Sequence, residues 1–148
     1  MNHRHLIGVL AIAAVAAGCV TASHTPSSAA GKNDDEVAIV RSETVNSVGT
    51  EIVAVTGEQG PVLKYQIYTS YREVRLEPGH YIVRFLVGVP GKRLIFPDRE
   101  VRIRAGYTYS FRAVPIMDAQ AVRLDYHVQT TAAAKASRGV APEWKEAK

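Results

Sequence analysis

Cys19 is the residue whose type and position most directly indicate a reaction. It is the single cysteine of the chain, and it directly follows Gly18 and an apolar run from Leu6 to Ala17. A thiolate is a strong nucleophile, and small neighbours such as Ala17 and Gly18 let the chain lie extended in an enzyme site. Because a lone cysteine forms no disulfide within its own chain, Cys19 is available for a covalent modification.

The residues before Cys19 have the layout of a secretory signal. Met1 to His5 carries Arg4, and the apolar run of residues 6–17 follows it. This run is shorter than the roughly 20 apolar residues that a membrane-spanning helix needs, so we expect this N-terminal segment to be a signal peptide that is removed. The alternative is an ordinary signal in which the cysteine lies beside the cleavage site by chance.

The sequence Ala17-Gly18-Cys19 after this run resembles the lipobox of bacterial lipoproteins. The resemblance implies that the Cys19 sulfur carries a diacylglycerol, that the signal is cut just before it, and that the new amino terminus is acylated. Two or three acyl chains hold a protein to a membrane almost irreversibly, since each buried methylene contributes about 0.8 kcal/mol. Val20, in place of an aspartate, implies the outer membrane, with the protein facing the periplasm.

The composition indicates one small folded domain. The chain has 148 residues, of which 47% are hydrophobic and 22% charged, which is ordinary for a globular protein. The net charge of +4 favours anionic partners in general and identifies none of them. For an exported chain, nucleic acid is not an expected partner.

Four parts are expected along the chain. They are the signal peptide at 1–18, the lipidated Cys19 with a flexible tether at 19–35, a β-sandwich domain at 36–128 and a mobile tail at 129–148. The tether is rich in Ser, Thr, Ala, Gly and Pro and has no apolar period. The tail is alanine-rich and lacks an apolar face, and its Trp144 either packs back on the domain or docks on a partner.

An alternation of apolar and polar residues predicts strands from Val37 to Val128, a stretch without a helical period. The clearest alternation runs through Val74–Phe85 and Val101–Phe111, and each of these stretches predicts a hairpin. Pro78-Gly79 predicts a type II turn with a positive φ at the glycine. About seven short strands of this kind predict an all-β fold, a small antiparallel β-sandwich.

The stretch LEPGHYIVRF followed by VRIRAGYTYSF resembles the PEGA-type and carboxypeptidase-regulatory-like β-sandwich modules of bacterial envelope proteins. The matching positions are Leu76, Pro78, Gly79, Tyr81, Gly106 and Tyr109. The resemblance implies a structural or adhesive role.

Four arginines are predicted to face outward from the sheet, because they alternate with apolar residues that face inward. They are Arg84, Arg102, Arg104 and Arg112. If their strands are neighbours, four guanidinium groups share one face, which suits the phosphates of lipopolysaccharide or the carboxylates of peptidoglycan. The alternative is a solvated face on which glutamates lie between the arginines.

The segment from Lys92 to Pro97 combines charge with three consecutive apolar residues. One interpretation is a loop that contacts a membrane or a partner protein. The other is a short strand at the edge of the sandwich, a position that suits Pro97.

We find no pattern that predicts catalytic, cofactor-binding or metal-binding residues. His80 and His127 lie on different predicted strands, and no HxH or HExxH spacing occurs. Gly88 to Arg93 lacks the first glycine and the Ser or Thr of a phosphate-binding loop. The expectation is therefore a membrane-anchored envelope lipoprotein with a structural or protein-docking role, no cofactor and no catalysis. The alternatives are a binder of anionic envelope polymer and a soluble exported enzyme.

Overall fold

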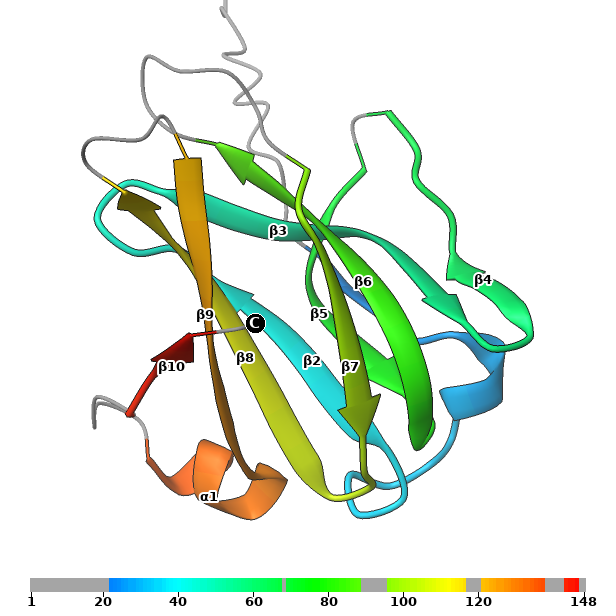
Figure 1. Cartoon of the computed structure of the whole chain (residues 1–148). Helices are drawn as coiled ribbons and strands as arrows, with labels where there is room; N and C mark the ends of the chain where they lie inside the picture. The colour runs from blue at the N-terminus through cyan, green and yellow to red at the C-terminus, as the bar shows by residue number, and fades with distance from the viewer. Residues whose placement is uncertain (1–21, 68, 89–95, 117–120, 138–142, 147–148) are drawn as a thin grey trace, which may run out of the picture.

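The computed structural model describes residues 22–67, 69–88, 96–116, 121–137 and 143–146 (Figure 1). Most of the described elements are strands, in keeping with their β-branched and aromatic residues. In chain order the elements are β1 (Ala22–His24), the short 3-10 helix η1 (Ser27–Ala29), β2 (Ala38–Glu43), β3 (Gly49–Gly57), β4 (Gly60–Leu63), β5 (Tyr71–Leu76), β6 (Gly79–Gly88), β7 (Asp98–Ile103), β8 (Tyr107–Ile116), β9 (Ala121–Thr130), α1 (Thr131–Ala136) and β10 (Lys145–Glu146).

The strands form one mixed sheet. Its order is β10-β9-β8-β2-β5-β3-β6-β7, with β1 added to β5 and β4 added to β3. The pairs β2–β8 and β1–β5 are parallel, and the remaining pairs of described strands are antiparallel. The sheet curls into a half-barrel (Figure 1), which brings β7, at one end of this order, near β8 and β9 at the other end.

The all-β class is confirmed, and the detailed architecture differs from the prediction. The described residues form ten strands in one curled, mixed sheet instead of about seven in an antiparallel sandwich. A period of two identifies a strand and its buried face, but it does not identify the neighbouring strand. Strands as short as β1 and β10 also contain too few residues to display alternation.

The two predicted hairpins are wrong in their pairing, although their strands exist. β5 and β6 both pair with β3, which lies between them, and β7 and β8 are not neighbours in the sheet. Gly79 is not among the glycines with positive φ and is the first residue of β6. A Cβ at Gly79 would lie 3.1 Å from the Tyr81 ring, so close packing explains this glycine. Gly106, at φ 77°, does supply the turn between β7 and β8.

The core lies on the inner face of the curl. Its largest fully buried side chains include Phe85 of β6 and Phe111 of β8, whose ring centroids are 5.0 Å apart. β3 and β8 are also joined by a hydrogen bond, because the Ala113 N–H donates to the buried Thr50 Oγ1 over 3.0 Å. β2 ends at Glu43, opposite Arg112, so Thr50 serves a backbone donor that lies beyond the end of the β2–β8 ladder.

The described part of the segment expected to be a flexible tether lies against the sheet. β1 pairs with β5, and ion pairs join Lys32 to Glu77 and Arg75 to Asp34. Asp34 also pairs with Lys135 of α1. Hydrogen bonds from Lys135 and Arg75 hold the pKa of Asp34 below its ordinary value of 3.8. The described fold therefore extends to the N-terminal side of residue 36, the predicted start of the domain.

The segment expected to be a mobile tail also contains regular structure. β9 continues to Thr130, two residues past the predicted boundary at 128, and Thr130 caps α1 by accepting a hydrogen bond from the Ala133 N–H over 3.2 Å. Thr131 anchors the helix, since its buried hydroxyl lies 3.2 Å from that of Thr108. A helix too short to be stable alone is thus held by tertiary contacts.

The hydrogen bond between β3 and β8 predicts the effect of an isosteric substitution. Thr50→Val keeps the shape of the side chain but leaves the buried Ala113 N–H without its acceptor, so the free energy of unfolding should fall by about 1–3 kcal/mol. Chemical denaturation measures the change. Thr56→Val, at an exposed position of the same strand, is the matched control and should change stability by less than about 0.5 kcal/mol. Equal stabilities of the two variants would contradict the role given to Thr50.

Candidate functional site

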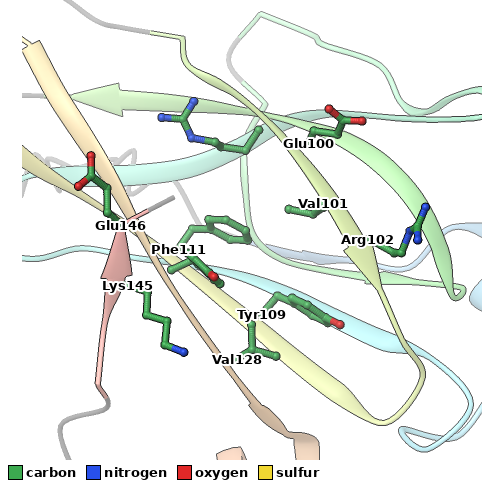
Figure 2. A pocket seen from close by; sticks show the side chains of 10 residues that line it. Glu100, Val101, Arg102, Tyr109, Phe111, Val128, Lys145 and Glu146 are labelled. Carbon is green, nitrogen blue, oxygen red and sulfur yellow. The ribbon is translucent and has the colours of Figure 1, made fainter. Parts of the chain in front are cut away.

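A cleft of about 460 Å³ opens between β7 and the β8–β9–β10 end of the sheet (Figure 2). It lies at the place where the half-barrel is not closed by hydrogen bonds, because β7 and β10 are the two ends of the strand order. The lining residues are Arg99, Glu100, Val101, Arg102, Tyr109, Phe111, Tyr126, Val128, Lys145 and Glu146. The mouth of the curled sheet is therefore the candidate functional site.

The floor of the cleft is apolar and aromatic. Val101 of β7 faces Tyr109 and Phe111 of β8, with Tyr126 and Val128 of β9 beside them. Phe111 and Tyr109 are 2% and 8% exposed, whereas Val128 is 38% exposed. The Tyr109 hydroxyl accepts a hydrogen bond of 3.0 Å from the Arg104 N–H, which fixes the ring. A partly exposed apolar floor can accept an apolar group without a change in the core.

The two acidic residues of the cleft rim have basic neighbours. Glu100 Oε1 lies 2.7 Å from His80 Nε2 on the adjacent strand β6. Glu146 contributes to the raised pKa of Arg123, whose largest cause is the hydrogen bond to Asp125. Each of these carboxylates thus already has a basic group outside the cleft as a neighbour.

The positive charges of the three cations on the cleft rim, Arg99, Arg102 and Lys145, have no carboxylate partner among the described residues. Arg99 donates to the Asp98 carbonyl over 2.9 Å, and its buried Nε has no partner in the described part of the chain. A buried donor without a partner is costly, so an acceptor brought into the cleft would be stabilised there. The arrangement favours a ligand with an apolar group on the floor of the cleft and an anionic group beside the cations of the rim.

Arg99 was missed by the sequence analysis. It has the same parity on β7 as Val101 and Ile103, so its side chain starts on the inner face of the sheet. Parity therefore could have identified it, but an inward arginine is unexpected in a core. It is accommodated because β7 borders the open side of the half-barrel.

The four predicted arginines do not form one basic face. Arg84 lies on the outer side of β6 and forms a two-point ion pair with Asp98, at 2.7 and 2.8 Å. Arg112 lies on β8, and β2, β5 and β3 separate β8 from β6. Arg104 is exposed just after β7, and Arg102 is the one member of the four that lines the cleft. Parity predicts that Arg84, Arg102 and Arg112 point away from the core, but the order of the strands keeps these three arginines apart.

Arg112 is part of a polar cluster on β8 and β9. It lies 3.4 Å from the buried carboxylate of Asp125, which also accepts from Arg123 over 2.7 Å. The guanidinium carbon of Arg112 lies 4.2 Å from the centroid of the Trp144 ring, a cation–π distance. Trp144 therefore packs back on the sheet, the first of the two alternatives drawn from the sequence.

Two of the predicted features lie outside the described residues. They are Cys19 with its lipobox and residues 92–95 of the Lys92–Pro97 segment, of which Phe96 and Pro97 are described. Within the described ranges, no three His, Cys, Asp or Glu residues converge as metal ligands. Neither α1 nor another described helix has the length and apolar character that a membrane span requires.

Comparison with known proteins gives no match for this chain. No family model, curated protein or solved structure is similar to it at a significant level. The resemblances to lipoproteins and to PEGA-type modules therefore stay predictions, and a function has to be argued from the residues themselves.

The ion pair of Arg84 and Asp98 predicts a pH-dependent stability. The hydrogen bond from Arg84 holds the pKa of Asp98 below 3.8, so the ionised carboxylate stabilises the fold above that pH. Because both side chains are partly exposed, Asp98→Asn should lower the free energy of unfolding by less than about 1 kcal/mol at pH 7. Denaturation at several pH values should show the difference disappearing as the pH falls through the lowered pKa. In an Arg84→Gln background, Asp98→Asn should have no comparable effect, and a difference that persists at the lowest pH would contradict the assignment.

Proposed function

We propose that this chain is a lipid-anchored protein of the bacterial envelope with a structural or docking role and no catalysis. The anchor is the diacylglycerol on Cys19, and the location is the outer membrane, with the domain facing the periplasm. The docking surface is the cleft between β7 and β8–β10. The observation that carries the docking role is the composition of this cleft, an apolar floor beneath three cations that contact no carboxylate of the described residues.

The edge of β7 favours a partner that is an extended segment of another protein. Among the described strands, β7 pairs with β6 alone, so its second edge offers main-chain donors and acceptors. Addition of a strand to such an edge is a common mode of peptide recognition. The charged residues Asp98, Arg99 and Glu100 on β7 discourage unspecific pairing of this edge. An extended segment with apolar side chains and an acidic group fits both the edge and the cleft.

In-cell photo-cross-linking tests the docking role. Benzoylphenylalanine in place of Val128, on the cleft floor, should form a discrete covalent adduct with an envelope protein, because the partner covers this position. The same residue in place of Thr56, which is exposed on β3 away from the cleft, is the control and should give no such adduct. Absence of an adduct from position 128, or the same adducts from both positions, would contradict the proposal.

A second candidate function is binding of an anionic envelope polymer, and the cations of the cleft rim favour it. Of the four arginines first considered, Arg84 and Arg112 form ion pairs with aspartates and Arg104 is not among the residues that line the cleft. The site would therefore involve Arg102 together with Arg99 and Lys145. Carboxylates of peptidoglycan and phosphates of lipopolysaccharide both suit guanidinium groups.

Co-sedimentation with peptidoglycan sacculi and with lipopolysaccharide tests this second candidate. The double variant Arg102→Gln/Lys145→Gln should bind about tenfold more weakly than the wild type, which corresponds to about 1.4 kcal/mol. Arg72→Gln/Arg104→Gln removes the same charge at exposed positions outside the cleft and is the matched control. Equal losses in the two double variants, or no loss in either, would exclude the cleft as a polymer site.

A further inference from the structure

Three large apolar side chains form an exposed patch at one end of the molecule. They are Tyr65, Ile67 and Phe96, which are 49%, 69% and 44% exposed. The rings of Tyr65 and Phe96 meet edge to face with centroids 5.9 Å apart, so the loop before β5 and the segment before β7 share one surface. Both lie at the upper end of the half-barrel in Figure 1. We call these three residues the apolar tip.

The loop that carries Tyr65 and Ile67 contains a tight turn. The Thr69 N–H donates to the Gln66 carbonyl over 3.2 Å, and the two residues form an isolated β-bridge. Ile67 lies within this turn, and most of its side chain is exposed. Lys64 is exposed beside Tyr65 and adds a positive charge at the border of the tip.

The N-terminal strand β1 begins beside the start of β5, so only a short length of chain separates the predicted lipid anchor from the apolar tip. Ala22, the first residue of β1, pairs with Tyr71, the first residue of β5. Cys19 precedes Ala22 by three residues, and three residues span at most about 11 Å. Ile67 precedes Tyr71 by four residues, which limits their separation to about 14 Å. A membrane that holds Cys19 is therefore within reach of the tip, and no long tether separates the two.

We propose that Tyr65, Ile67 and Phe96 form a membrane-contact surface that lies in the head-group region of the bilayer to which Cys19 is anchored. This inference rests on the proposed function, because the lipid on Cys19 is what brings the bilayer within reach of the apolar tip. Aromatic side chains favour the interface between lipid and water, and an exposed isoleucine gains by leaving water. Lys64 complements the negative head groups of an anionic phospholipid. The domain is thus seated directly on the lipid surface.

Spin labelling of the full chain tests this contact. The protein is purified from host membranes and reconstituted into vesicles of phosphatidylethanolamine and phosphatidylglycerol, with a nitroxide on Ile67→Cys or, as the control, on Ala136→Cys. Both positions are exposed, so labelling does not disturb the core, and α1 lies at the opposite end of the molecule from the tip (Figure 1). The Cys19 sulfur of an acylated chain is a thioether and takes no label. The readout is relaxation of the label by oxygen, which concentrates in lipid, against relaxation by a water-soluble nickel complex.

The expected result is a higher ratio of oxygen to nickel relaxation at position 67 than at position 136. If the chain stays on the vesicles through an alkaline wash but both labels are equally accessible to nickel, the membrane-contact surface is wrong and the anchor stands. If the alkaline wash releases the chain, the anchor itself is wrong, and the inference falls with it.

Discussion

The packing of Phe85 against Phe111 is the contact on which the rest of the structure depends. These rings come from β6 and β8, which are far apart in the strand order, and they meet because the sheet curls around its own core. The hydrogen bond between Thr50 of β3, the neighbour of β6, and Ala113 of β8 joins the same two sides of the curled sheet. A sheet of this size buries one face only if it curls, since no second layer of the described chain covers that face. The curl therefore replaces the second sheet of a sandwich.

The same curl creates the cleft, and other contacts hold the N-terminal segment against the sheet. It brings β7 near β8 and β9 without pairing them, so apolar side chains at the mouth stay partly exposed and the edge of β7 stays unpaired. The ion pairs of Asp34 with Arg75 and Lys135, together with the β1–β5 ladder, hold the N-terminal segment against the sheet. The proposed anchor on Cys19 is thereby held close to the domain. The N-terminal segment thus serves attachment, and the cleft serves docking.

The sequence predicted the faces of the strands better than their neighbours. Alternation correctly assigned Val83 and Phe85 to the core and Arg84 to the surface, because side-chain parity is a local property of a strand. It did not predict that β3 separates β5 from β6, which depends on contacts distant in the chain. For that reason parity left open whether the four arginines share one face, and Arg99 was overlooked. The glycine at position 79 was assigned to a turn, whereas the packing of Tyr81 explains it.

The proposed attachment of the domain to a membrane depends on lipid on Cys19. Intact-mass analysis of the protein extracted from the membranes of its native host tests this attachment, with a Cys19→Ser form measured alongside. We expect a mature species that begins at Cys19 and is heavier than its amino-acid sequence by the mass of acyl groups, and no such species for the Cys19→Ser form. An unmodified chain that begins at another residue would contradict the proposed anchor and would leave Cys19, where present, as a free thiol.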